Sequence, residues 1–220
     1  MDEGTDFLYP FLGDEGRGAP SGALLEDLAA SAVAKGEASA QLRAAALNAT
    51  AGTRAAAAAA MAERFAAGGR LLTFGNGGSS TDAAGLATLF TRPPWGSALP
   101  ARTLVEDPAV LTALGNDVGF DLVFARQVIA HGTPTDIALG ISTSGTSRNV
   151  LVAFEQASSQ GLLTIGLAGY DGGAMALSPH VDHCLVVAAD SIHRIQEAQA
   201  TLGFALWAAV QEHGSKVDHG

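Results

Sequence analysis

The fold is decided by one stretch of the chain, Arg70-Leu71-Leu72-Thr73-Phe74-Gly75-Asn76-Gly77-Gly78-Ser79-Ser80-Thr81-Asp82-Ala83-Ala84-Gly85-Leu86-Ala87. Its first part, residues 70–74, is a short aliphatic run whose length and composition predict a buried strand. A Gly/Ser-rich turn follows, and the residues from about 83 onward predict a helix. A strand, a glycine-rich turn and a helix in this order form the repeating unit of an α/β protein.

Four further apolar runs extend this pattern along the chain, at residues 102–105, 136–141, 162–167 and 184–187. Because they are apolar on both faces and are separated by helical stretches, they predict a parallel sheet that is covered on both sides. The predicted fold class is therefore α/β, with a doubly wound parallel sheet and helices on both faces.

A single domain is predicted over residues 22–212, with an N-terminal part at 22–67 and an α/β core at 68–212. The N-terminal part is Ala-rich and contains no proline, so it predicts two helices with a break near residues 48–52. These N-terminal helices precede the first strand of the sheet.

The two ends, residues 1–21 and 213–220, are predicted to be tails. The first tail contains the aromatic cluster Phe7-Leu8-Tyr9-Pro10-Phe11-Leu12, which has no helical or strand period. This cluster is either part of a loosely ordered end or an anchor that docks on a neighbouring subunit.

Composition limits the partners and the compartment. The 220 residues include 12 basic and 22 acidic side chains, which gives a formal net charge of −10, and 48% of them are hydrophobic. Because this charge repels phosphate backbones and anionic lipid, broad binding to nucleic acid or to a membrane surface is not expected. The single cysteine, Cys184, lies in an apolar run and predicts a buried, inert thiol. Acidic residues replace a signal peptide at the N-terminus and no apolar run reaches membrane-spanning length, so we expect a cytoplasmic protein.

The turn after the first strand has the chemistry of a phosphate-binding loop. Gly77 and Gly78 permit a tight turn and a close approach of the backbone to a ligand. The start of the following helix offers free N–H groups and the positive end of the helix dipole. The side chains of Asn76, Ser79 and Ser80 add hydrogen-bond donors.

A second loop repeats this chemistry after the third predicted strand, as Gly140-Ile141-Ser142-Thr143-Ser144-Gly145-Thr146-Ser147-Arg148-Asn149. Five hydroxyl residues within six positions form neither a good strand nor a good helix, but they are suitable donors around an anionic ester. Neither loop carries the Lys of a nucleotide P-loop or a complete G-x-G-x-x-G run. Both loops follow strands of a parallel sheet, so they are expected at its carboxyl edge, where ligands bind. We therefore expect a small phosphate ester rather than ATP or NAD.

Four motifs occur in a specific order: Gly75-Asn76-Gly77-Gly78-Ser79, Gly115-Asn116-Asp117, Ser142-Thr143-Ser144-Gly145-Thr146-Ser147 and Arg194-Ile195-Gln196-Glu197. Through these motifs, the chain from about Leu24 to Val210 resembles the sugar isomerase (SIS) family, specifically its phosphoheptose isomerase branch, which acts on sedoheptulose 7-phosphate. The resemblance implies a flavodoxin-like sheet of five parallel strands and a homotetramer, or a dimer, with sites between subunits.

The resemblance also implies roles for individual residues. The phosphate would be held by Ser142, Thr143, Ser144 and Ser147. The sugar would be contacted by residues of the first loop and the last helix: Asn76, Gly77, Gly78, Ser79 and Gln196. Asp117 would reach the site from a neighbouring loop.

The chain departs from the family at the positions that perform its chemistry. Enzymes of this branch carry a His and a Glu four residues apart on the helix after the first loop, and a Gln and a His eight residues apart on the last helix. The matching positions here are Gly85 and Leu89, then Gln196 and Phe204, so only Gln196 is retained. Zinc needs three or four N, S or carboxylate ligands, and we therefore expect no metal site and no cofactor.

Other residues could supply the acid and base that an aldose–ketose isomerase requires. His193 and Glu197 are four residues apart and would share one face of a helix beginning near Ser191, beside Gln196. With Asp117 they form a candidate catalytic set, although His193 and Glu197 could equally be a first-turn histidine and a solvated pair.

Two other pairs of histidines carry weaker signals. His180 and His183 have a spacing that some metal sites use, but a structural role in a surface loop is favoured. His213 and His219 lie in a polar, glycine-containing end that is expected to be disordered.

Three functions are therefore compatible with the sequence. The favoured one is a sensor or regulatory protein that keeps a phosphosugar pocket and has lost the isomerase machinery. The alternatives are an active, metal-independent phosphosugar isomerase that uses His193, Glu197 or Asp117, and an adaptor that binds a protein partner.

Overall fold

The computed structural model describes residues 22–217 and divides the chain into two compact units, Met1–Ala38 and Ser39–Gly220. The predicted tail 1–21, with its aromatic cluster, lies outside the described residues. In the first unit the described residues form the beginning of α1 (Gly22–Ala49), whose side chains are largely exposed. The second unit contains the rest of α1 and all the other elements.

The N-terminal sequence forms two helices, as predicted. α1 is followed by α2 (Ala51–Ala66), and the break falls at Thr50. The hydroxyl of Thr50 donates to the Ala46 carbonyl oxygen at 2.7 Å.

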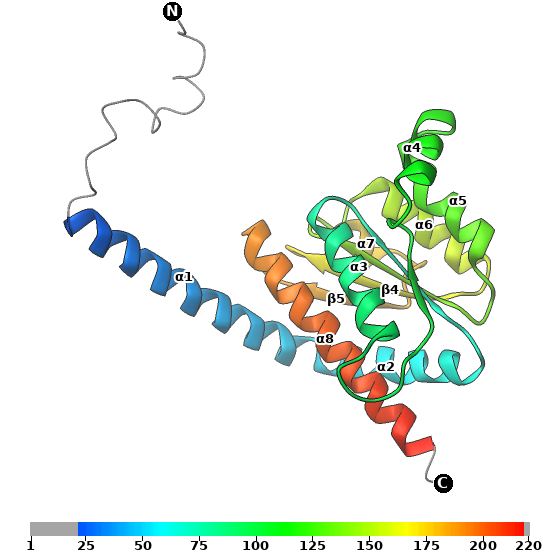
Figure 1. Ribbon diagram of the computed structural model, residues 1–220, viewed down its shortest axis with the longest axis horizontal. Helices are drawn as coiled ribbons and strands as arrows, with labels where there is room; N and C mark the ends of the chain where they lie inside the picture. Colours follow the sequence, from blue (N-terminus) through cyan, green and yellow to red (C-terminus); the bar gives the residue numbers. More distant parts are fainter. Residues whose placement is uncertain (1–21, 218–220) are drawn as a thin grey trace, which may run out of the picture. The chain divides into compact units, whose positions relative to one another are not determined.

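The sheet contains five parallel strands in the order β2-β1-β3-β4-β5 (Figure 1). Their bounds are β1 Leu71–Gly75, β2 Ala101–Thr103, β3 Ile137–Ser142, β4 Leu163–Gly169 and β5 His183–Val187. Each lies within two residues of its predicted run, and the doubly wound fold class is confirmed. The order changes direction between β1 and β3, which is where an open sheet of this kind forms its ligand crevice.

The helices that follow the strands have these bounds: α3 Gly78–Thr91, α4 Pro108–Asp117, the 3-10 helix η3 Phe120–Leu122, α5 Val123–His131, α6 Arg148–Ser159, α7 Gly173–Leu177 and α8 Ile192–Val217. Asp107 caps α4, because its carboxylate accepts from the N–H groups of Ala109 and Val110.

The end of α8 differs from the sequence prediction. The helix continues through His213 to Val217, so the expected tail from residue 213 is wrong over 213–217, while His219 lies outside the described residues. The last turns are held to the rest of the unit by Gln211, which is 7% exposed. Its side-chain amide accepts from the N–H of Ser97 and donates to the carbonyl oxygen of Ser97, both at 2.9 Å.

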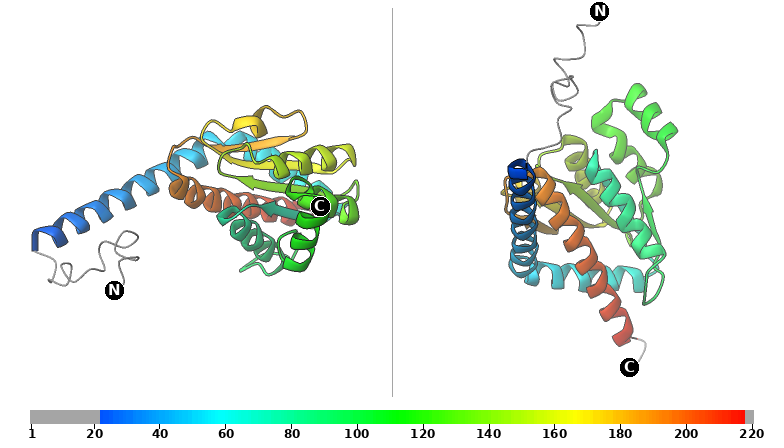
Figure 2. Two further views of the ribbon diagram at one scale, coloured as in Figure 1. Left: turned by 90° about the horizontal axis from the view of Figure 1, so that it is seen from above. Right: turned by 60° about the vertical axis from the view of Figure 1, so that its left-hand side comes forward.

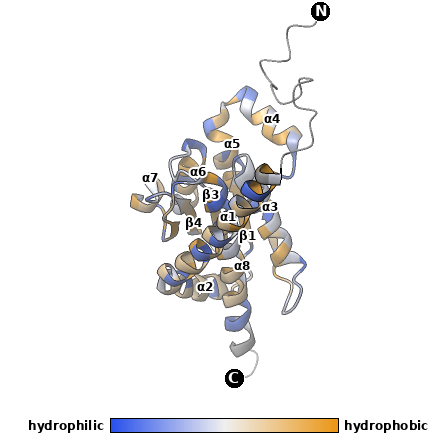
Figure 3. Ribbon diagram, turned by 90° about the vertical axis from the view of Figure 1, so that its left-hand side faces the viewer, coloured by the Kyte–Doolittle hydropathy of each residue, from blue (hydrophilic) through white to orange (hydrophobic). Residues whose placement is uncertain are grey.

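The alternating side chains of the buried strands pack into two cores, one on each face of the sheet. Figure 2 shows helices on both faces of the sheet. Leu139 of β3 packs on the face that α2, α3 and α8 cover, and Ala138 packs on the opposite face with α5, α6 and α7. Figure 3 shows hydrophobic and hydrophilic residues alternating along the helices, as expected for helices that cover a sheet on one side. No helix within residues 22–217 is long and apolar enough to span a membrane.

Candidate functional site

The hydroxyl-rich loop after β3 is internally hydrogen-bonded around Ser142. This side chain is 3% exposed, and its Oγ lies 3.0 Å from the Oγ of Ser147 and 3.4 Å from that of Ser144. It also accepts from the N–H of Gly145 at 3.1 Å, while Ser144 Oγ accepts from the hydroxyl of Thr146 at 2.9 Å. The loop is thus pre-organised, and its hydroxyls converge immediately before the start of α6.

The turn after β4 packs against the backbone of this loop. Gly145 has φ +64°, and a Cβ built on it would lie 2.0 Å from the carbonyl oxygen of Gly172. The Gly145 carbonyl oxygen accepts from the N–H of Met175 at 2.8 Å. A Cβ on Gly173 would lie 2.6 Å from the carbonyl oxygen of Ser144. The Asp171-Gly172-Gly173 turn therefore holds the loop in place through backbone contacts, for which glycine is required.

The two predicted phosphate loops are joined by a reciprocal pair of amides. Asn76 Nδ2 donates to Asn149 Oδ1 at 2.8 Å, and Asn149 Nδ2 donates to Asn76 Oδ1 at 2.9 Å. Asn149 is 3% exposed and lies in the first turn of α6. This pair brings the loops together as predicted, but it uses one donor and one acceptor of Asn76 that sequence reasoning had assigned to the sugar.

The glycine turn of the first loop contacts the last helix. A Cβ on Gly78 would lie 2.2 Å from Gln196 Nε2, so the glutamine occupies the space that any side chain at position 78 would need. Gly77 is exposed with φ +54°. Ser79 is 4% exposed, and the hydroxyl of Ser80 donates to the Gly77 carbonyl oxygen at 2.6 Å. Gln196 therefore lies against the first loop.

A cavity of about 350 Å³ lies beside these loops, between α3 and α8. Its lining residues come from both helices and from the ends of β3 and β4: Thr81, Asp82, Gly85, Leu86, Leu89, Ile141, Leu167, Gln199, Ala200, Gly203 and Phe204. Gln199 connects the cavity to the second loop, because its Nε2 donates to the carbonyl oxygens of Ser142 at 3.5 Å and Leu167 at 3.2 Å. The walls are mainly aliphatic and aromatic.

The three positions at which the resemblance implies ligands or catalytic groups that this chain lacks all line this cavity. Gly85 and Leu89 lie on α3, and Phe204 lies on α8. None of them carries a donor atom for a metal, whereas zinc takes three or four N, S or carboxylate ligands. Among residues 22–217 there is also no group of three or more His, Cys, Asp or Glu side chains that could hold a metal ion. The residues present therefore do not fit a zinc site.

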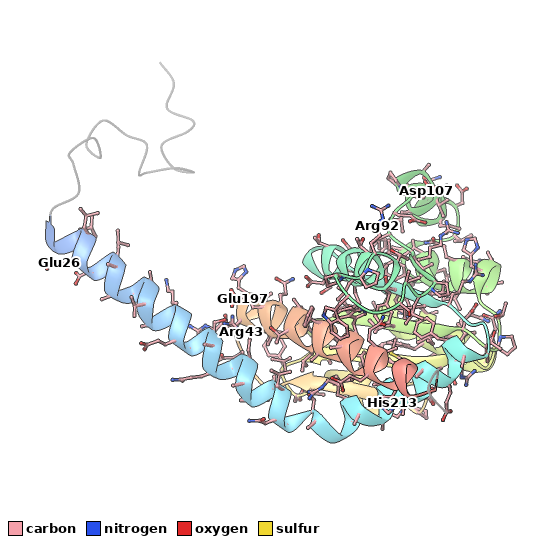
Figure 4. All side chains as sticks on the ribbon, turned by 60° about the horizontal axis from the view of Figure 1, so that its bottom comes forward. Glu26, Arg43, Arg92, Asp107, Glu197 and His213 are labelled. Carbon is pink, nitrogen blue, oxygen red and sulfur yellow. The ribbon has the colours of Figure 1, made fainter. Side chains whose placement is uncertain are left out.

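The predicted acid and base residues lie at exposed positions. His193 and Glu197 are both exposed near the start of α8, and neither lines the cavity. Glu197 is hydrogen-bonded to the hydroxyl of Ser39 and lies 3.7 Å from Nη1 of Arg43 (Figure 4). Asp117, at the end of α4, is exposed and accepts from Asn116 Nδ2 at 2.8 Å. The structure does not bring this set together at the cavity within one chain.

Sequence reasoning did not single out two polar residues of the cavity. Asp82 is half-buried on α3, and this burial raises its pKa above the ordinary value of 3.8. Gln199 is 1% exposed, and its Oε1 is buried with no hydrogen-bond partner among the described residues. The only signal for them was their spacing: Asp82 lies three residues after Ser79, and Gln199 three residues after Gln196.

Two further sequence predictions concern Cys184 and the pair His180 and His183. Cys184 is partly buried rather than fully buried as predicted, and this burial raises the pKa of its thiol to about 11. The backbone N–H of His180 donates to Ser178 Oγ at 3.2 Å, and neither His180 nor His183 belongs to a metal-binding group in the described chain.

Comparisons with known proteins agree with this architecture. The model of the SIS domain family matches residues 36–169. A phosphoheptose isomerase from Solidesulfovibrio magneticus is 47% identical over 164 residues, which cover 72% of this chain and 77% of that protein. One from Chlorobaculum tepidum is 45% identical over 161 residues, which cover 69% and 74%.

Solved structures of phosphoheptose isomerases superpose on this chain as well. A phosphoheptose isomerase from Francisella tularensis superposes with a TM-score of 0.77 at 34% identity, covering 83% of this chain and 97% of that chain. One from Neisseria gonorrhoeae has a TM-score of 0.77 at 34% identity, covering 86% and 99%.

Proposed function

Because the chain belongs to the SIS domain family, in its phosphoheptose isomerase branch, we propose that it binds a phosphorylated sugar and acts as a sensor or regulatory protein. The site has two halves that support this proposal differently. One is the pair of phosphate loops, and the other is the cavity between α3 and α8.

The loops support the binding of a phosphate ester. The hydroxyl oxygens of Ser144 and Ser147 lie 3.4 Å and 3.0 Å from Ser142 Oγ, immediately before the start of α6. An anion placed there receives hydrogen bonds from hydroxyls and interacts with the positive end of the helix dipole. The relatives named phosphoheptose isomerase act on a phosphorylated sugar by that name, which supports the same class of ligand here.

The single observation that carries the regulatory role is the apolar lining of the cavity. Gly85, Leu89 and Phe204 occupy the positions where the resemblance implies ligands or catalytic groups, and they can neither hold zinc nor transfer a proton. The candidate replacement Glu197 is engaged by Ser39 and Arg43. Binding of the sugar without turnover is the function that this combination supports best.

A metal-independent phosphosugar isomerase is the second candidate. It is favoured by the 47% identity to a protein named phosphoheptose isomerase. In that case His193, Glu197 or Asp117 would have to reach the sugar, and a neighbouring subunit could supply one of them.

We further propose that the protein is a homotetramer or a dimer. Apolar side chains are exposed along the part of α1 in the first unit: Leu25 is 53%, Leu28 is 56% and Val33 is 61% exposed. Three exposed aliphatic side chains on one helix are typical of a surface that a second chain covers. Light scattering coupled to size-exclusion chromatography measures the mass, and a monomer at micromolar concentration would contradict this proposal.

The test of function is a thermal-shift screen combined with NMR. The protein is mixed with sedoheptulose 7-phosphate or glucose 6-phosphate, with added zinc or with EDTA, and each mixture is followed by NMR for a day. A ligand bound only by the folded state raises the melting temperature. We expect a shift with sugar phosphate, no new NMR signals and no effect of zinc.

The variant Ser144→Ala/Ser147→Ala serves as the control, since it should abolish the shift. Product signals would instead establish the isomerase. If no sugar phosphate changes the melting temperature, binding of a phosphosugar is contradicted and a protein partner is favoured.

A further inference from the structure

The cavity between α3 and α8 begins where the second phosphate loop ends. Its floor contains Ile141, the residue before Ser142, and its wall contains Gln199, whose amide donates to the Ser142 carbonyl oxygen. A sugar whose phosphate lies among the loop hydroxyls can therefore extend into the cavity. The volume of about 350 Å³ is large enough for a ligand of this size.

Asp82 is the only charged residue in the lining of this cavity. Among the residues that the structure describes, no hydrogen bond or ion pair engages its carboxylate. It lies three residues after Ser79 on α3, so the two side chains share a helix face, about 4.5 Å apart along the axis. Asp82 therefore lies one helical turn beyond the glycine turn of the first loop, in the lining of the cavity.

The surroundings of Asp82 favour a positively charged partner. Leu86, Leu89 and Phe204 of the lining carry no side-chain hydrogen-bond donor, and the amide of Gln199 already donates to the carbonyl oxygens of Ser142 and Leu167. Burial in these surroundings raises the pKa of the carboxyl, which shows that the anion lacks compensation in the free protein. A neutral hydroxyl would supply one hydrogen bond but no charge, whereas an ammonium group supplies both. Beside such apolar side chains the attraction between opposite charges is stronger than in bulk water.

We propose that this cavity selects phosphate esters that carry an ammonium group, such as amino-sugar phosphates, and that Asp82 is the residue that recognises the ammonium. The inference rests on the proposed function, because it takes the phosphate to lie in the loop around Ser142. It adds the chemical class of the ligand and a specificity residue.

The experiment compares two sugars that differ in one group. Isothermal titration at pH 7.0 measures the affinity of the full chain for glucosamine 6-phosphate, which carries an ammonium group, and for glucose 6-phosphate, which carries a hydroxyl at the same carbon. We expect the amino sugar to bind roughly ten- to a hundredfold more tightly, the range that a charge-assisted hydrogen bond supplies. The variant Asp82→Asn keeps the size of the side chain and should bind both sugars with similar affinity.

A matched control separates the local effect from the change in net charge. Glu63→Gln removes one negative charge from an exposed position on α2 outside the cavity lining, and it should keep the preference for the amino sugar. Equal affinity of the wild-type protein for both sugars, or an unchanged preference in Asp82→Asn, would overturn the inference.

The loop variant Ser144→Ala/Ser147→Ala distinguishes this failure from failure of the proposed function. If that variant weakens both sugars equally while Asp82→Asn has no effect, phosphate binding stands and only the ammonium preference is wrong. If neither sugar binds the wild-type protein, or if the loop variant binds both as the wild-type protein does, the proposed function fails and this inference fails with it.

Discussion

Gly145→Ala should be among the most destabilising single-methyl changes in the site, because two separate costs coincide there. Gly145 has φ +64°, a conformation that costs a residue with a Cβ about 1–2 kcal/mol. In addition, the new Cβ would lie 2.0 Å from the carbonyl oxygen of Gly172, and 2.6 Å from its carbonyl carbon. These neighbours are backbone atoms, and the loop cannot move away without lengthening the bond from Met175 N–H to the Gly145 carbonyl oxygen. Overpacking of this kind adds about 1–3 kcal/mol, so the expected loss is about 2–5 kcal/mol.

The matched control is Gly68→Ala, because Gly68 also has a positive φ, +81°, but has no neighbouring atom within 4 Å of the built Cβ. This variant should lose only the backbone cost of about 1–2 kcal/mol. Urea denaturation of both variants at one protein concentration gives the two free energies of unfolding. Gly145→Ala should also weaken phosphosugar binding, whereas Gly68→Ala should not. Equal losses of stability would refute the conclusion that the 171–173 turn holds the phosphate loop by direct backbone contact.

Three other predictions concern single side chains. Asn149→Ala removes both hydrogen bonds of the amide pair with Asn76, so it should lower the free energy of unfolding by about 1–3 kcal/mol. Urea denaturation measures this change, and a loss below about 0.5 kcal/mol would contradict a stabilising role of the pair. Burial raises the pKa of Asp82 above 3.8, so its folded state binds the proton more tightly than the unfolded state does, and stability falls as the pH rises from 3.8 through the folded pKa. Asp82→Asn should therefore be more stable than the wild-type protein at pH 7 and equally stable below pH 3.8, and thermal unfolding at both pH values tests the sign. Finally, because the pKa of Cys184 is raised to about 11, its thiol should react with a disulfide reagent at pH 8 far more slowly in the folded protein than in guanidinium, and equal rates would show that it is not protected.

Most of the fold followed from the sequence because its signals are local. Each strand is a short apolar run, and each predicted phosphate loop combines glycine or hydroxyl residues with the start of a helix. The second loop was predicted to supply hydroxyl donors around an anionic ester, and in the structure Ser142 lies within hydrogen-bond distance of both Ser144 and Ser147.

The features that could not be predicted join residues far apart in the chain. Glu197 was considered as a base, but it is engaged by Ser39 and Arg43 of α1, and no pattern near Glu197 indicates those partners. The end of α8 past His213 likewise depends on a distant part of the chain, since the Gln211 side chain is hydrogen-bonded to the backbone of Ser97. Asp82 was overlooked because an aspartate near the start of a helix is common for electrostatic reasons alone.

The contact between Gly78 and Gln196 couples two positions that are far apart in the sequence. A Cβ at position 78 would lie 2.2 Å from the amide nitrogen of Gln196, which is the flexible end of that side chain. A substitution of Gly78 therefore turns the glutamine away from the first loop, and a shorter residue at position 196 makes room for a side chain at position 78. The two positions are thus expected to change together during evolution rather than independently.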